Sequence, residues 1–218
     1  MRWQIISIWF LIGLLSGCAQ TENLRVSSLA GEDSGSDYKR FVIVSGSYKP
    51  VDNDLTFGEF ARQAKWILIQ KGFIAVDDPK NAQLLVALSY HIGAPQTRTE
   101  VVNTPDYPMF GPVYIRHYGY YYPYWRYPVY NTSVYQYTTY KKTVRLYAID
   151  AKAFRANQTV KPLWDVVVSS NNENSDLRYM FPYMLVAAGE YIGKNSGYSV
   201  PLALDKNDSQ VALLRLVN

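Results

Sequence analysis

Hydrophobic positions repeat at helical spacing over residues 55–71, which is the clearest helix pattern in the chain. One face of this segment collects the side chains Phe57, Phe60, Ala61, Ala64 and Leu68. Thr56 and Glu59 match a capping box, with Leu55 and Phe60 at the positions of a hydrophobic staple. Gly72 follows directly, as expected after a helix C-terminus. The pattern therefore predicts one amphipathic helix with a defined start and end.

Alternating hydrophobic positions predict strands elsewhere. Residues 82–92 place apolar side chains on one face and only partly polar ones on the other, so this strand is expected to be central in its sheet. The segments 143–149 and 163–168 are expected to pair as an antiparallel hairpin across a turn or wide loop over 150–161. Shorter strand patterns cover 41–44, 73–76, 134–137 and 211–217.

A second helix is predicted after Ser175 and Asp176, which are suitable N-caps. Pro182 falls inside it and would kink the helix or shift its start, and Gly193 is a plausible stop. The predicted fold is therefore an α+β domain. A mainly antiparallel sheet is packed by two helices, with a long tyrosine-rich insertion between strands.

The first residues carry a different pattern. Arg2 is followed by an apolar run from Ile5 to Leu15, which matches a secretory signal and is about half as long as the ~20 residues that cross a bilayer. The run ends in Leu15, Ser16, Gly17 and Cys18, which resembles a bacterial lipobox.

This resemblance implies cleavage before Cys18 and attachment of a diacylglycerol to its sulfur, usually with a further acyl chain such as palmitate on the new amino group. The alternative is an ordinary signal peptide beside an unmodified cysteine. Several acyl chains, at about 0.8 kcal/mol per buried methylene, would anchor the protein stably. Ala19 follows Cys18, and in Gram-negative lipoproteins the lack of an aspartate there implies sorting to the outer membrane, facing the periplasm.

The sequence thus divides into a signal peptide at 1–17, an acylated cysteine and flexible tether at 18–38, and a single α+β domain at 39–218. The tether is inferred from polar and small residues that end in an acidic, glycine- and serine-rich stretch.

Several short motifs together resemble a family of uncharacterised proteobacterial outer-membrane lipoproteins with an α+β domain of unknown function. They are the helix end at 69–73, the strand at 82–90, and the segments 146–150, 163–165, 176–184 and 191–193. The resemblance covers roughly residues 40–195 and implies fold and envelope location. It transfers no catalytic residue.

Tyrosine is the unusual feature of the composition. Twelve of the 20 tyrosines fall within residues 107–140, and no aspartate or glutamate occurs between Tyr107 and Ile149. Tyrosine gives a large contact area at a low ordering cost, and cations beside aromatic rings allow cation–π contacts. The candidate binding surface comprises Tyr118, Tyr120, Tyr121, Tyr122, Tyr124, Trp125, Arg126, Tyr127 and Tyr130.

Two interpretations of this segment stay open. It could be a surface that stacks on envelope glycans, settles at the membrane interface, or docks another envelope protein. Alternatively, it could be a long hairpin whose aromatic side chains cover their own sheet.

Other chemistry is sparse in the sequence. Only two histidines occur, His91 and His117, and neither has a second ligand at zinc spacing, so no metal site and no cofactor beyond the covalent lipid is expected. No nucleophile elbow or phosphate-binding loop is present. A net charge of +4 is too small to predict nucleic-acid binding.

The sequence therefore predicts a non-enzymatic binding module, anchored in the envelope through Cys18, that makes contact through its Tyr/Arg-rich segment. The alternative is an accessory subunit of an envelope transport or assembly complex, bound through the sheet or the 176–193 helix. A glycan-acting enzyme is the weakest hypothesis, because no pair of catalytic carboxylates is evident.

Overall fold

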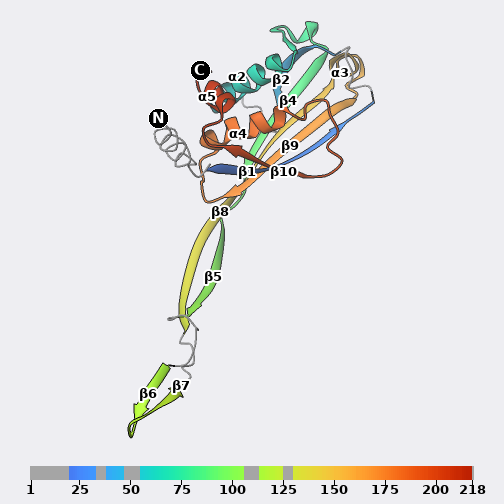
Figure 1. Ribbon diagram of the computed structural model, residues 1–218. Coiled ribbons are helices and arrows are strands. Elements are labelled where there is room, and N and C mark those ends of the chain that lie inside the picture. Colours follow the sequence, from blue (N-terminus) through green and yellow to red (C-terminus); the bar gives the residue numbers. More distant parts are fainter. Residues whose placement is uncertain (1–19, 33–37, 47–54, 106–112, 125–129, 218) are drawn as a thin grey trace, which may run out of the picture. The chain divides into compact units, whose positions relative to one another are not determined.

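The computed structural model describes residues 20–32, 38–46, 55–105, 113–124 and 130–217 (Figure 1). The chain divides into two compact units. The sheet unit is Met1–Ala94 with Tyr140–Asn218, and the ribbon unit is Pro95–Thr139. Strand β8 runs through the boundary, so its first ten residues belong to the ribbon unit and the rest to the sheet unit.

The sheet unit is built on a strand order of β10-β1-β9-β8-β4-β2-β3. Neighbours are antiparallel except that β2 pairs in parallel with both β4 and β3. The predicted α+β class with a mainly antiparallel sheet is therefore confirmed. The strands are β1 (Thr21–Ala30), β2 (Arg40–Ser45), β3 (Ile74–Ala75), β4 (Leu84–Ile92), β8 (Tyr130–Asp150), β9 (Pro162–Asn172) and β10 (Val200–Asp205).

Alternation along β4 and β8 decides which face of the sheet is buried. Leu84, Val86 and Leu88 are buried almost completely, and β4 lies between β2 and β8 as the central strand that the sequence predicts. The antiparallel pairing of β8 with β9, expected from residues 143–149 and 163–168, is also confirmed.

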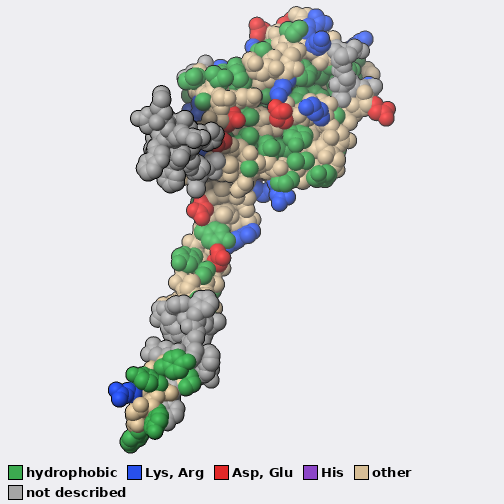
Figure 2. All heavy atoms as spheres, viewed as in Figure 1, with side chains coloured by type: hydrophobic (Ala, Val, Ile, Leu, Met, Phe, Trp, Pro, Cys, Tyr) green, Lys and Arg blue, Asp and Glu red, His purple; other side chains and the backbone are tan. Residues whose placement is uncertain are grey.

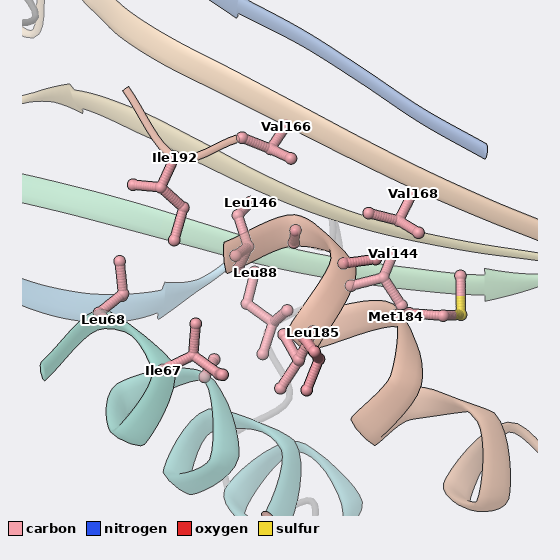
Figure 3. Close-up of a cluster of buried hydrophobic side chains, with 14 of the residues drawn as sticks. Ile67, Leu68, Leu88, Val144, Leu146, Val166, Val168, Met184, Leu185 and Ile192 are labelled. Carbon is pink, nitrogen blue, oxygen red and sulfur yellow. The ribbon is translucent and has the colours of Figure 1, made fainter. Parts of the chain in front are cut away.

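Helices cover one face of this sheet. Side chains of α2 and α4 join those of the strands in a single hydrophobic core (Figure 3). Val211 and Leu214 of α5 belong to the same core. At its centre the Phe60 ring stacks on Phe181, with centroids 3.8 Å apart, and meets Tyr90 edge-on. The helices are α2 (Leu55–Gln70), α3 (Ala151–Asn157), α4 (Leu177–Gly189) and α5 (Ser209–Arg215), with a short 3₁₀ turn, η2 (Pro79–Asn81).

Helix α2 confirms the predicted amphipathic pattern. Phe60, Ala64 and Leu68 are buried against the sheet. The predicted staple is wrong, because Leu55 is 90% exposed and so does not pack on Phe60. Thr56 lies within the first turn of α2, and Glu59 forms an ion pair with Arg178 of α4 at 2.7 Å.

Helix α4 begins where the sequence predicts. The Asp176 carboxylate accepts a hydrogen bond from the Arg178 N–H at 2.8 Å, which caps the helix. Pro182 is accommodated inside the helix and is buried. The helix ends at Gly189, so the stop expected at Gly193 falls in the following turn, where Gly193 has a φ of 68°.

The flexible tether predicted for residues 18–38 is wrong for Thr21–Ala30, which form β1 between β9 and β10. Leu24 and Val26 are buried in the core. Ser28 is also buried, and its hydroxyl donates to the Lys194 carbonyl at 2.8 Å, with the Tyr191 carbonyl 3.0 Å away. The hydrophobic alternation along β1 is weak because serine and arginine occupy three of the ten positions.

Three further differences lie in the C-terminal part of the chain. The loop expected over 150–161 contains α3, which Asp150 caps by accepting from the Lys152 and Ala153 N–H groups. The strand predicted over 211–217 is instead α5, because Asp208 caps a helix that buries Val211 and Leu214. The edge strand β10 was not predicted.

Candidate functional site

The ribbon unit contains two antiparallel strand pairs. In the first, all ten residues of β5 (Gln96–Pro105) pair with the first ten of β8. In the second, β6 (Val113–His117) pairs with β7 (Tyr120–Tyr124).

The β5–β8 pair is exposed on both faces. Val101 and Val134 lie directly opposite each other and are still 57% and 63% exposed. The contacts that hold the pair together are polar: the Thr97 and Thr138 hydroxyls lie 3.1 Å apart, and Thr132 donates to Asn103 at 2.8 Å. Within the described residues, β5 pairs with β8 alone, and residues 130–139 of β8 pair with β5 alone. Each strand therefore leaves an open edge, which can pair with another chain.

The β6–β7 hairpin turns at Tyr118 and Gly119. Both residues have positive φ angles, 48° and 85°, which is the geometry of the tight turn that suits a twisted hairpin. The Tyr118 ring meets the His117 ring edge-on, with centroids 4.5 Å apart. Residues 118–124 of the tyrosine run thus form the turn and the second strand of this hairpin.

Four tyrosines of the hairpin have strongly exposed rings, and Figure 2 shows hydrophobic side chains of these strands at the surface. We call this set the tyrosine surface: Tyr114 (63% exposed), Tyr118 (90%), Tyr120 (71%) and Tyr121 (68%). These side chains do not cover their own sheet, so the interpretation of the segment as a self-covering hairpin is wrong for them.

Positive charge accompanies these rings. Arg116 is exposed and lies directly opposite Tyr121 in the hairpin register. Side chains directly opposite each other in an antiparallel pair are close enough to interact, so a cation and a ring stand together on one face. With no carboxylate between Tyr107 and Ile149, the hairpin sequence itself carries no negative side chain.

The structure brings together only part of the predicted surface. Tyr118, Tyr120 and Tyr121 lie in the hairpin, while Tyr130 begins β8 and is 54% exposed. Tyr122 and Tyr124 belong to β7, but their side chains lie outside the description. Trp125, Arg126 and Tyr127 lie outside the described residues, as do Leu15, Ser16, Gly17 and Cys18.

The other face of the sheet in the sheet unit carries few covering side chains. Ala151 at the start of α3 joins Ala82, Leu85 and Ile149 in a small second cluster. Beyond it, Arg145 makes two hydrogen bonds of 2.8 Å to Asp165 and lies over the Tyr147 ring at 4.7 Å. The hydrogen bond to Asp165 raises the pKa of the Arg145 guanidinium.

The sequence analysis missed a buried lysine on the helix-covered face. Lys142 is fully buried and donates to Asn172 Oδ1 at 2.7 Å, and Asn172 in turn donates to Glu22 at 3.2 Å. Burial lowers the pKa of the Lys142 ammonium, while Glu22 and Asp176 act in the opposite direction. A signal for this residue exists in the sequence, since Lys142 has the same strand parity as the core residues Val144 and Leu146.

Most of the helix proposed as an alternative docking element is buried. Residues 180–189 of α4 are all buried, and Tyr183 at its centre donates to the Lys206 carbonyl at 2.9 Å. Asp176, Arg178 and Glu190 at the two ends of the segment are exposed, so docking through these ends stays a prediction.

Among the described residues there is no group of three or more histidine, cysteine, aspartate or glutamate side chains placed to hold a metal ion. His91, expected as a structural residue, is exposed on β4. No helix within the described ranges has the length and apolar character needed to cross a bilayer.

The geometry thus defines an α+β protein with a helix layer on one face of its sheet and a tyrosine-rich pair of two-stranded elements. The chain belongs to the family described as "Domain of unknown function (DUF4136)", which matches residues 30–187. This confirms the resemblance to an uncharacterised family with a domain of unknown function.

Other comparisons give less. No curated protein matches the chain significantly. Among solved structures, a PDZ domain protein from Parabacteroides distasonis is similar at 16% identity and a TM-score of 0.42, over 93% of this chain and 43% of that protein. The chain therefore spans less than half the length of this structural relative.

Proposed function

We propose that this protein is a lipid-anchored, non-enzymatic binding module of the bacterial cell envelope, and that it contacts its partner through the ribbon unit. The observation that carries the proposal is the tyrosine surface: four rings at least 63% exposed on a hairpin of only two strands. A two-stranded hairpin has no core of its own and is marginally stable in water. A partner that covers these rings would bury apolar surface and stabilise the hairpin.

A protein partner fits the ribbon unit best. The β5–β8 pair offers two open edges whose backbone groups another strand can satisfy by β-augmentation. Exposed tyrosines add contact area without losing many rotamers, and Arg116 favours an acidic or aromatic surface on the partner. Stacking on envelope glycans uses the same rings and is the second possibility for the partner.

The anchor rests on the sequence Leu15-Ser16-Gly17-Cys18 after a short apolar run. On this proposal the mature chain begins at acylated Cys18, and Ala19 directs it to the outer membrane, facing the periplasm. Mass spectrometry of the N-terminal peptide tests the anchor. Wild-type chain should carry the mass of a diacylglycerol and an acyl chain on Cys18, and Cys18→Ala should leave the membrane fraction. An unmodified Cys18 in the mature protein would contradict the anchor.

Paired tyrosine variants test the binding surface. The full chain, solubilised from membranes in mild detergent, should run in native electrophoresis as a complex larger than the isolated protein. The double variant Tyr120→Ser and Tyr121→Ser should lose that complex, because serine removes the exposed contact area. Tyr198→Ser is the matched control, since Tyr198 lies in the sheet unit and is 73% exposed. Equal loss of the complex in both variants would overturn the proposal.

A second candidate is an accessory subunit of an envelope assembly, bound through the sheet. The observation that favours it is the sparsely covered sheet face, on which Leu29 is 64% exposed beside the half-buried Val167. In that case Leu29→Ser, and not the Tyr120/Tyr121 pair, would remove the complex.

A further inference from the structure

A basic pocket lies at one end of the sheet unit, where β2 and β4 begin and β8 ends. Its volume is about 440 Å³, in the range of small-ligand sites. Side chains from η2, α3 and the adjoining strand ends line it, among them Tyr38, Arg40, Lys80, Asp150, Lys152 and Arg155.

Four cations face one carboxylate in this pocket. The side chains of Arg40, Lys80 and Lys152 are exposed, and the described part of the chain offers none of them an ion pair or a side-chain hydrogen bond. Unpaired cations that converge on one cavity raise the local concentration of anions. Among the residues that line it, the cavity therefore has an excess of positive charge.

Hydrogen bonds hold the Arg155 guanidinium where it can bind an anion. Its Nη1 donates to the Pro79 carbonyl at 2.7 Å and to the Ala82 carbonyl at 3.1 Å. These bonds fix the guanidinium without neutralising its charge, because both acceptors are carbonyls. The other N–H groups of the guanidinium have no partner among the described residues and can donate to an oxyanion.

The single carboxylate, Asp150, is already committed. Its Oδ1 accepts from the Lys152 and Ala153 N–H groups, and its Oδ2 accepts from the Tyr38 hydroxyl at 2.9 Å. Burial works to raise the pKa of this carboxyl, but the hydrogen bonds outweigh it and the pKa lies below its usual value. Asp150 thus caps the N-terminus of α3, and its charge partly opposes binding of a second anion.

We propose that this pocket binds a phosphate-bearing anion, a phosphate or pyrophosphate group held by Lys80, Lys152 and Arg155. A multiply charged oxyanion matches several cations that approach from different segments, whereas a single carboxylate would satisfy only one or two of them. A larger hollow of about 650 Å³ on the sheet face has only Arg25 and Lys141 as cations, so it makes the weaker case. The proposal does not depend on the tyrosine surface.

Calorimetric titration of the full chain in dodecyl maltoside with inorganic pyrophosphate tests the site. Wild type should bind one pyrophosphate, and Lys80→Gln with Lys152→Gln should weaken binding by about tenfold or more, because two charge-assisted contacts are lost. Arg25→Gln with Lys141→Gln is the matched control, since it removes the same charge from the other hollow. Lys141 lies nine residues from Asp150 along β8, about 30 Å away.

A variant that binds pyrophosphate more tightly separates loss of the binding site from loss of binding by misfolding. Asp150→Asn should tighten pyrophosphate binding severalfold, because asparagine still caps the helix but removes the opposing charge. Absence of saturable binding, or equal weakening by the two double variants, would overturn the proposal.

The phosphate group could belong to a lipid headgroup or to a soluble compound. Repeating the pyrophosphate titration in bicelles of phosphatidylcholine, with and without phosphatidylglycerol, separates these sources. Weaker apparent pyrophosphate binding with phosphatidylglycerol supports a headgroup ligand, and unchanged binding overturns that source in favour of a soluble one.

Discussion

Lys142 shows how a single residue can shape this fold without belonging to any binding surface. Its ammonium is buried among core side chains, and Asn172 Oδ1 is its shortest contact at 2.7 Å. A buried charge is tolerated only when it is hydrogen-bonded and balanced. Glu22 supplies the balance through Asn172 and also lies 3.8 Å from Lys206. The cluster ties β1, β8, β9 and the segment before α5 together.

Asn172→Ala should therefore be costly. It leaves the Lys142 ammonium without its short acceptor, and the expected loss of unfolding free energy is about 2–4 kcal/mol. Asn171→Ala is the natural control, because Asn171 is exposed on the opposite face of β9. Urea denaturation followed by tryptophan fluorescence measures the free energy of unfolding of both variants. A loss below about 0.5 kcal/mol for Asn172→Ala, typical of a surface change, would show that the cluster does not balance the charge.

Tyr183 makes a second prediction, on pH dependence. Burial raises the pKa of its hydroxyl to about 12, although Arg215 acts in the opposite direction. Between about pH 10, where an unfolded tyrosine titrates, and pH 12 the folded state keeps a proton that the unfolded state loses. The folded state binds more protons there, so stability falls as pH rises.

Phenylalanine in the variant Tyr183→Phe has no hydroxyl that can titrate. The thermal midpoint of this variant should fall less steeply between pH 9 and 11 than that of wild type, even though it starts lower through loss of the hydrogen bond to the Lys206 carbonyl. Parallel curves for the two proteins over this range would contradict the assignment.

At the scale of elements, the sequence predicts best where one pattern decides the structure. Strand β4, the β8–β9 pair and the buried face of α2 follow from the periodicity of their apolar residues. Strand β1 does not, because it is recruited by the neighbours β9 and β10, which lie more than 130 residues later in the chain.

Helix α5 shows a different limit. Residues 211–217 read equally well as a buried strand or as a short helix, and the Asp208 cap and the burial of Val211 and Leu214 in the core decide for the helix. The basic pocket leaves still less trace in the sequence, since Arg40, Lys80 and Arg155 come from three separate segments.

The hairpin turn gives a prediction at this scale. Gly119 has a φ of 85°, a conformation that costs an L-residue about 1–2 kcal/mol, so Gly119→Ala should strain the turn. Because β6 and β7 pair only with each other among the described strands, the effect should be local. Amide hydrogen exchange should rise across β6 and β7, while the thermal midpoint of the sheet unit stays unchanged. Unaltered exchange in β6 and β7 would contradict the turn geometry.

At the scale of the whole molecule, the two units differ in how they are stabilised. The sheet unit has a continuous core shared by its strands and by α2, α4 and α5. In the ribbon unit, backbone pairing and polar contacts hold mostly exposed strands, and the rings of the tyrosine surface are presented to solvent. The sequence locates the tyrosine-rich segment correctly. It could not show which rings are exposed, because that depends on strand register.

In the proposed function, the sheet unit is the scaffold and the ribbon unit contacts the partner. The buried face of α4 is an internal contact that a partner does not reach. The tyrosine surface has no such internal role, and the proposed binding function therefore depends on it.

Photocrosslinking in living cells is the most direct test of that claim. Tyr121 and, separately, Tyr198 are replaced by p-benzoylphenylalanine in the full chain, because both tyrosines are exposed but lie in different units. The account predicts a discrete adduct of defined mass from position 121 after irradiation and none from position 198. The same adducts from both positions, or no adduct from position 121, would contradict it.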